Sequence, residues 1–335
     1  MSMRIYNLTI MLMFATGQVA ADNLFVCSDS SHQVLQFDGD NGEEIGPFSF
    51  VANPTGITFQ TLKSLHGISG DLFACSSSSH QVLRFNGQSG EEMGPFCSVA
   101  NPTDLTFGSL GDLFVTSSSS HQVLRFDGQS GEAMGPFCSV VNPSALTFRL
   151  LPVSGDLFVT SSSSHQVLRF DGESGEAMGS FCSVANPTAL TFGPTGDLFV
   201  SSSTSHQVLR FDGQSGEVMG SFCSVANPES LAFGSNGNLY VTSMSSHQVL
   251  EFDGQSGEAM GPFCFVANPI ALTFRIEATE CNGDVNSDGT VNVSDVLQVL
   301  NSWGLCEGCD EDINQDGDVN VSDLLLLVAN WGQCE

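Results

Sequence analysis

The sequence predicts an all-β fold, a six-bladed propeller closed by pairing of its N- and C-terminal strands, followed by a small α-helical calcium-loop domain. The first observation is a repeat, because His-Gln-Val-Leu occurs six times at spacings of 48, 41, 44, 41 and 41 residues. This period is typical of propeller blades, four-stranded units that bury their apolar faces only by stacking on neighbours. The second observation is a twelve-residue pattern of oxygen ligands that occurs twice after residue 281.

Each repeat contains four short apolar runs separated by turn residues, as expected for one blade. In the third repeat these runs cover residues 104–107, 112–116, 121–126 and 133–140. The segment "DGQSG" at 127–131 predicts the hairpin between the third and fourth strands, since Gly and Asp tolerate positive φ. An Asn-Pro pair before each first strand is expected to end the preceding outer strand, because Pro cannot continue a ladder.

The two ends of the array complement each other. After residue 21 the chain begins with a second strand, "DNLFVC", and the array ends with a first strand, "NPIALTF" at 268–274. Pairing these strands completes a sixth blade and removes the exposed edges of an open array. The pattern "GDLFVT…HQVLRFDG…G" resembles NHL-type repeats and six-bladed relatives such as streptogramin lyase and gluconolactonase-like propellers, over residues 22–275. This resemblance implies architecture far more than activity.

Residues 1–21 have the pattern of a secretory signal peptide. Arg4 supplies the positive charge, residues 8–15 form a short apolar core, and Val19-Ala20-Ala21 fits a cleavage site. Neither this run nor any later one is long enough to span a bilayer. We therefore expect a signal peptide at 1–21, the propeller at 22–275 and a calcium-binding domain at 276–335, in a secreted protein or one held in the periplasm or at the cell surface.

The net charge of −29, from 37 acidic and 8 basic side chains, excludes some classes of partner. Such a surface repels nucleic-acid phosphates and anionic lipid headgroups, and it suits divalent cations. The acidity is concentrated in residues 281–335, which contain eleven Asp and Glu and no Lys or Arg.

Two loops in this tail, 284–295 and 312–323, fit the calcium pattern with ligands at positions 1, 3, 5, 7, 9 and 12. Calcium prefers hard oxygen ligands at this spacing, and without it the carboxylates would repel one another. The alternative is a pair of acidic turns without metal. The pattern predicts two Ca²⁺ ions, held by Asp284, Asn286, Asp288, the Thr290 carbonyl, Asn292 through water and Asp295, and by Asp312, Asn314, Asp316, the Asp318 carbonyl, Asn320 and Asp323.

Each loop precedes an apolar helix signal, at 296–304 and 324–332, and carries Asp where an ordinary EF-hand has Glu. This duplicated arrangement resembles a type I dockerin over about residues 282–332. The resemblance implies a cohesin-like partner on an extracellular scaffold, commonly one that collects polysaccharide-degrading enzymes. The chain departs from many dockerins at loop positions 10 and 11, where it has Val293-Ser294 and Val321-Ser322.

The cysteines divide between the two regions. In an exported chain, the bracketing of the calcium loops suggests the disulfides Cys281–Cys306 and Cys309–Cys334, although four cysteines allow three pairings. The spacing of Cys306 and Cys309 is also compatible with a zinc site, but the sequence has no second CxxC and no nearby His to complete one. Buried free thiols are expected in the propeller, where outer-strand cysteines of different blades lie too far apart to bridge. These are Cys97, Cys138, Cys182, Cys223 and Cys264, with Cys27 and Cys75 on second strands.

Candidate ligand-binding residues gather where we expect the mouth of the propeller channel. Asp104 replaces a small residue at the start of an inner strand, Glu229 replaces Thr or Ser one position earlier in another blade, and Asp29 interrupts a serine run. These carboxylates could form a polar site or lie as solvated loop charges. The repeated histidines could bind a ligand or metal, or serve a structural purpose common to all blades. They are His32, His80, His121, His165, His206 and His247.

The nearly uniform blades favour a non-catalytic binding and display protein, with a carbohydrate or peptide ligand at the propeller face. The alternative is a propeller enzyme, a lyase or glycoside-active hydrolase in a polysaccharide-degrading complex. No nucleophile elbow, phosphate loop or HExxH motif is present in the sequence.

Overall fold

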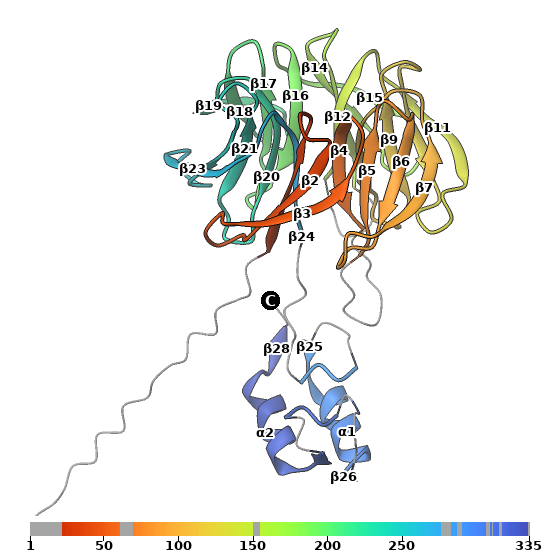
Figure 1. The fold of residues 1–335 in the computed structure, drawn as a ribbon, viewed down its shortest axis with the longest axis vertical. Helices are drawn as coiled ribbons and strands as arrows, with labels where there is room; N and C mark the ends of the chain where they lie inside the picture. The colour runs from red at the N-terminus through yellow and green to blue at the C-terminus, as the bar shows by residue number, and fades with distance from the viewer. Residues whose placement is uncertain are drawn as a thin grey trace, which may run out of the picture.

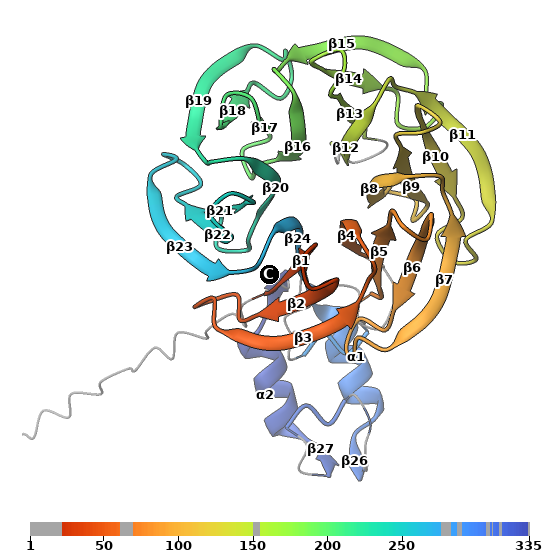
Figure 2. The same ribbon diagram turned by 45° about the horizontal axis from the view of Figure 1, so that its top comes forward.

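The computed structural model describes residues 22–60, 70–149, 155–275, 283–286, 290–305, 309, 311–314 and 317–333. The predicted signal peptide lies outside these residues. Six four-stranded antiparallel sheets form a ring around a central axis, as the prediction requires (Figures 1 and 2). In each sheet the strand that begins at a proline lies innermost, and successive inner strands contact one another around the axis.

The first three blades each follow the chain from the inner to the outer strand. Blade 1 comprises β4 (Pro54–Phe59), β5 (Leu72–Ser76), β6 (Gln81–Phe85) and β7 (Glu92–Ser98). Blade 2 comprises β8 (Pro102–Phe107), β9 (Leu113–Ser117), β10 (Gln122–Phe126) and β11 (Ala133–Ser139). Blade 3 comprises β12 (Pro143–Phe148), β13 (Leu157–Ser161), β14 (Gln166–Phe170) and β15 (Ala177–Ser183).

Blades 4 and 5 repeat this order, and blade 6 joins the two ends of the array. Blade 4 comprises β16 (Pro187–Phe192), β17 (Leu198–Ser202), β18 (Gln207–Phe211) and β19 (Val218–Ser224). Blade 5 comprises β20 (Pro228–Phe233), β21 (Leu239–Ser243), β22 (Gln248–Phe252) and β23 (Ala259–Phe265). Blade 6 comprises β24 (Pro269–Arg275), β1 (Asn23–Ser28), β2 (Gln33–Phe37) and β3 (Glu44–Phe50).

The predicted closure is confirmed by the pairing of β24 with β1. The two strands run antiparallel, with Asn23 opposite Arg275 and Cys27 opposite Ala271. Figure 2 shows the red N-terminal strands and the blue C-terminal strand side by side in this blade. The ring therefore has no open edge between its first and last blades.

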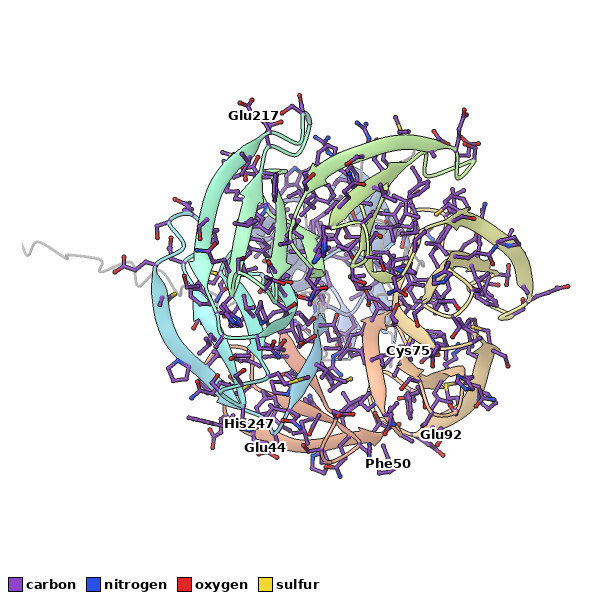
Figure 3. All side chains as sticks on the ribbon, turned by 90° about the horizontal axis from the view of Figure 1, so that it is seen from above. Glu44, Phe50, Cys75, Glu92, Glu217 and His247 are labelled. Carbon is purple, nitrogen blue, oxygen red and sulfur yellow. The ribbon has the colours of Figure 1, made fainter. Side chains whose placement is uncertain are left out.

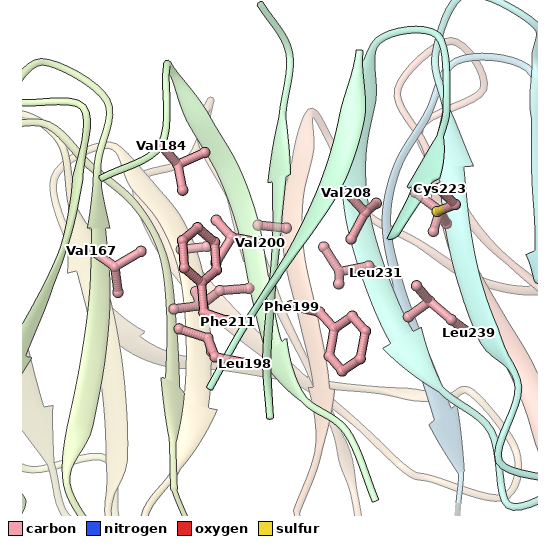
Figure 4. Close-up of a cluster of buried hydrophobic side chains, with 14 of the residues drawn as sticks. Val167, Val184, Leu198, Phe199, Val200, Val208, Phe211, Cys223, Leu231 and Leu239 are labelled. Carbon is pink, nitrogen blue, oxygen red and sulfur yellow. The ribbon is translucent and has the colours of Figure 1, made fainter. Parts of the chain in front are cut away.

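The core lies between blades and explains why the second strands are buried throughout. All five residues of β17 are buried, because one face packs on each neighbouring blade. Phe199 contacts Phe222 of its own blade and Phe233 of the next edge-to-face, with ring centroids 4.8 and 5.0 Å apart. Figure 4 shows the buried hydrophobic cluster that contains Phe199. The same contact among three aromatic side chains recurs in other blades, so the interfaces between blades are packed in the same way.

The seven propeller cysteines are buried free thiols, as predicted. Burial raises the pKa of Cys97, Cys138, Cys182, Cys223 and Cys264 to about 12. These groups therefore act as small apolar side chains and not as thiolates at neutral pH.

Two details differ from the sequence-based expectation. The proline of each Asn-Pro pair does not end the outer strand but is the first residue of the next inner strand, a position that needs no ladder donor. The histidine lies outside the third strand, which begins at the following glutamine. Both differences arise at left-handed residues, because His121 and Asn142 have φ of 58° and 50°.

The described part of the tail has two short helices, α1 (Val293–Asn301) and α2 (Val321–Ala329). They begin three residues before the predicted apolar runs, because Asn292 and Asn320 form capping boxes with Asp295 and Asp323. Two short ladders join the halves crosswise: β25 (Thr290–Val291) pairs with β28 (Gly332–Gln333), and β26 (Gly304–Leu305) with β27 (Asp318–Val319). In the part of the chain described here, no helix is long and apolar enough to cross a membrane.

Candidate ligand site at the channel mouth

A bulge near the start of each inner strand determines where the candidate carboxylates lie. In blade 2, Pro102 pairs with Ser117 and Leu105 with Val115, so Thr103 and Asp104 together face the single residue Thr116. The Thr116 hydroxyl closes this bulge by accepting from the Asp104 N–H at 2.9 Å and donating to the Asp104 carbonyl at 3.0 Å. Bulges redirect side chains, and here the two bulged residues contact the neighbouring inner strand.

A belt of hydroxyl groups links the inner strands at the first bulged position. Thr55 donates to the carbonyl of Pro102 in the next blade at 2.9 Å. The same bond recurs in the next three blades, from Thr103, Ser144 and Thr188 at 3.0, 2.8 and 2.7 Å. The belt is interrupted in blades 5 and 6, where Glu229 and Ile270 take this position. The interruption makes one side of the mouth chemically different from the rest.

Asp104 lies at the second bulged position of β8 and reaches the next blade. Its Oδ2 accepts from the backbone N–H of Leu146 in β12 at 3.1 Å. Ser230 makes the equivalent contact in β20, accepting from the N–H of Leu272 at 3.2 Å. Burial raises the pKa of Asp104 to about 7, although the N–H groups of Leu146 and Leu105 favour the ionised form. A proton therefore exchanges on this carboxyl near neutral pH.

Glu229 is the second carboxyl of the mouth and lies in β20. Its side chain is partly buried, and its Oε1 accepts from the Asn227 amide at 3.3 Å. Burial raises the pKa of Glu229 to about 7. Blades 2 and 5 are three positions apart in a ring of six, so Asp104 and Glu229 lie on opposite sides of the central axis. Both carboxyls titrate near neutrality and flank the same axis.

Asp29 does not lie on an inner strand. It follows β1 in the turn before β2, where its N–H donates to the Asn268 carbonyl at 3.1 Å. The turn lies on the same face as the Asn-Pro connections but outside the inner strands. Asp29 is thus a peripheral carboxylate of this face.

The six repeated histidines lie in the equivalent turn of each blade and do not converge on the axis. Each His has a φ between 56° and 58°, a region that His and Asn enter more readily than most residues. His165 Nδ1 accepts from the Asn186 N–H at 3.0 Å, and its carbonyl accepts from the Val184 N–H at 3.0 Å. The same ring contact occurs at His32, His80, His121, His206 and His247, at 3.0 to 3.2 Å.

These contacts make the histidine and the Asn-Pro asparagine one local unit, a feature that sequence reasoning missed. The asparagine also has positive φ, between 46° and 51° in the six blades. The constant spacing of 21 residues between each His and Asn was the available signal. Acidic side chains such as Glu44, Glu92 and Glu217 lie at the perimeter of the ring in Figure 3.

The described residues of the two predicted calcium loops are arranged around a buried carboxylate. Asp323 is fully buried, and its oxygens accept from the N–H groups of Asn314 at 3.1 Å and Asn320 at 2.8 Å. Asp295 accepts in the same way from Asn286 and Asn292, at 3.1 and 2.8 Å. Loop position 12 is therefore tied to positions 3 and 9 in both halves.

The second loop shows a further contact around its sixth position. Gly317 has a φ of 93° and donates its N–H to Asp312 Oδ2 at 2.8 Å. Carboxylate oxygens are ligands that calcium prefers, and Asp312 and Asp323 place buried carboxylates at loop positions 1 and 12. The described residues contain no group of three or more His, Cys, Asp or Glu side chains that could hold a metal ion. Asp288 and Asp316 lie outside the described residues, whereas Asp284, Thr290 and Asp318 lie in the described parts of the loops. Cys309 is disulfide-bonded, and Cys281, Cys306 and Cys334 lie outside the described residues.

Comparison with solved structures bears on the propeller. A chain in the crystal structure of a nidogen/laminin complex has a TM-score of 0.64 at 15% identity, covering 76% of this chain and 98% of that chain. Selenomethionine-substituted virginiamycin B lyase from Staphylococcus aureus has a TM-score of 0.49 at 16% identity, covering 67% and 78%. No family model and no curated protein matches the sequence. The first similarity shows the propeller fold alone, and the NHL and dockerin resemblances rest on the motifs themselves.

Proposed function

We propose that this protein is an exported binding and display module, in which the propeller recognises a carbohydrate or peptide at the channel mouth. The observation that carries this proposal is the placement of Asp104 and Glu229. Glu229 interrupts the hydroxyl belt, Asp104 replaces a small residue at the second bulged position, and the two lie on opposite sides of the central axis. Carboxyl groups beside a ring of hydroxyls offer both donors and acceptors to a polar ligand. The neighbouring structure of a nidogen/laminin complex supports protein or peptide recognition by this type of fold.

The test is binding by the full chain to an oligosaccharide array and to a peptide library. The double variant Asp104→Asn/Glu229→Gln retains side-chain volume and hydrogen-bonding atoms, and we expect it to lose the strongest signals. Asp29→Asn is the matched control, because this carboxylate lies on the same face but outside the inner strands. Equal signals from wild type and the double variant would exclude ligand binding by this pair.

A second function, catalysis, has one observation in its favour. A carboxyl group whose pKa is about 7 can donate a proton at neutral pH, which suits a lyase or a glycoside-active hydrolase. Turnover would appear as product release from an oligosaccharide that the array identifies. A rate that falls above pH 7 and is abolished in Asp104→Asn or Glu229→Gln would favour the enzyme over the display module.

For the tail we propose a dockerin-like attachment unit of residues 276–335 that binds two calcium ions and a cohesin-like partner. Support comes from the buried carboxylates of Asp295 and Asp323 and from the near-identical contacts of the two halves. The predicted signal peptide at 1–21 supports export. A pull-down from the secreted fraction of the source organism, with calcium or with EDTA, tests this attachment. Capture of the same proteins in both conditions contradicts a calcium-dependent partner.

A further inference from the structure

The far end of the inner strands carries a second irregularity in the repeat. In blade 3, Arg149 follows β12 and donates from Nη1 to the Gly213 carbonyl in the hairpin of the next blade, at 2.7 Å. Arg275 and Gln60 make the equivalent bond in blades 6 and 1, to Gly87 and Gly128, each at 2.9 Å. Three blades thus fill the same gap between blades with a long polar side chain of their own.

The blade 3 gap shows what this space accommodates. The Arg149 guanidinium lies over the Phe192 ring with its central carbon 5.9 Å from the centroid. The gap therefore offers a stacking surface and a carbonyl acceptor to the same cation. The other arginine of blade 3, Arg169, pairs with Asp156 and lies over the Phe158 ring, 5.8 Å from its centroid, so Phe192 is left to Arg149.

Blade 2 has glycine at this position, and the gap is open. Gly108 lines a pocket of about 220 Å³ together with Phe148 and Gly172. Phe148 and Gly172 are the repeat equivalents of Phe192 and Gly213, the two groups that hold Arg149. The pocket keeps the aromatic ring and the hairpin glycine but lacks the side chain that blade 3 places between them.

The rim of this pocket carries a negative charge that most of the other hairpins lack. Glu173 follows Gly172 and is exposed. Four of the other five hairpins have glutamine here, at Gln88, Gln129, Gln214 and Gln255. Asp112 also lines the pocket but is paired with Arg125, so the unpaired charge of the described lining comes from Glu173.

We infer that the pocket between blades 2 and 3 binds an arginine side chain of a protein partner. The guanidinium takes the place that Arg149 occupies one blade further on, stacking on Phe148, donating to the Gly172 carbonyl and pairing with Glu173. A planar cation with several donors suits this combination better than an ammonium group. Leu110, which is 78% exposed at the rim, gives the adjacent partner residues an apolar contact. This site lies at the opposite end of the blades from Asp104 and Glu229 and is independent of ligand binding there.

The experiment titrates acetyl-Gly-Arg-Gly-amide into the full chain and follows the phenylalanine ring resonances by NMR, with Phe148→Leu for assignment. Matched peptides carry lysine or citrulline in place of arginine. We expect saturable shifts of the Phe148 ring with the arginine peptide, at least threefold weaker binding of the lysine peptide, and none of the citrulline peptide. Absence of shifts, or equal binding of citrulline, would overturn the inference.

Two substitutions make the test specific to this pocket. Gly108→Arg supplies the missing side chain from the chain itself and should abolish binding. A Cβ at Gly108 would lie 2.8 Å from the Phe114 ring, so Glu173→Gln is the second variant, at an exposed position that leaves the fold unchanged. It should weaken the arginine peptide about threefold, the effect of one exposed ion pair. Gln214→Glu is the control, since Arg149 already fills that gap; a gain of binding there, or no loss in Glu173→Gln, contradicts the inference.

Discussion

Gly56 and Asp104 occupy equivalent positions in adjacent inner strands, and the absence of a side chain at Gly56 makes room for the carboxyl of Asp104. A Cβ built on Gly56 would lie 2.9 Å from Asp104 Oδ1 and 2.9 Å from its Cα. Ala145, Ala189 and Ala271 stand at this position in other blades, so the repeat itself tolerates a methyl group. The carboxyl of Asp104 in the next blade, and not the conformation of the repeat, therefore explains the glycine at position 56.

We expect Gly56→Ala to destabilise the propeller by roughly 1–3 kcal/mol, because the new methyl group forces Asp104 or its strand to shift. Urea denaturation at pH 7 measures this change. In an Asp104→Ala background the same substitution should cost much less, since two alanines already meet in other blades. Equal costs in both backgrounds would show that the two residues are not coupled.

The raised pKa of Asp104 makes stability depend on pH. The folded value of about 7 lies above the value near 4 of an unfolded chain, so the folded state binds more protons between these limits. The free energy of unfolding contributed by this group therefore falls as the pH rises through this window. Asp104→Asn removes the effect, and we expect its stability relative to wild type to be higher at pH 8 than at pH 5, by roughly 2 kcal/mol.

Denaturation curves of both proteins at the two pH values check this expectation. Asp104→Ser is the control variant, since Ser230 shows that a hydroxyl can accept the same N–H bond without titrating. Asn and Ser variants should show the same pH dependence. A difference from wild type that is equal at pH 5 and pH 8 would mean that the carboxyl is already ionised at pH 5.

The left-handed conformation of the histidines predicts which substitutions of them cost least stability. At His165, Asn keeps the tolerance of positive φ but loses the ring acceptor, whereas Val loses both. We expect His165→Asn to cost about 1 kcal/mol and His165→Val clearly more. Thermal unfolding of the two variants measures the difference. If Val were as stable as Asn, the backbone conformation would not explain the repeated histidine.

Calcium binding by the tail should be visible as two sites in a calorimetric titration of the EDTA-treated protein. Asp323→Ala should remove one site, because it deletes a buried carboxylate at loop position 12. Ser322→Ala at an exposed neighbouring position is the control and should retain both. A tail that resists protease equally with calcium and with EDTA contradicts the assignment.

One compensation shows how local identity depends on packing. In four blades an Arg–Asp pair joins the second and third strands, as in Arg210–Asp197. Blade 5 has Glu251 and Asn238 instead, and Tyr240 replaces phenylalanine and donates its hydroxyl to Glu251 at 2.8 Å. The sequence shows these three changes separately, but only their contact explains why they occur together.

The sequence by itself determined the blade count, the strand content and the closure of the ring. A period near 41 residues and one blade divided between the two ends of the array, three strands at the start and one at the end, leave one way to pair every strand edge. It also identified Asp104 and Glu229 as breaks in the repeat, because deviations from a period can be read without coordinates.

Only the tertiary structure decided what those breaks contact. The space that Gly56 leaves for Asp104, the placement of Asp104 and Glu229 on opposite sides of the axis, and the open gap at Gly108 all depend on residues of adjacent or facing blades. The same holds for His165, whose backbone conformation and bond to Asn186 arise across 21 residues of chain. A repeat determines the local strand pattern. Burial, steric clashes and charge pairing depend on residues that are distant in the sequence and come into contact only when the chain folds.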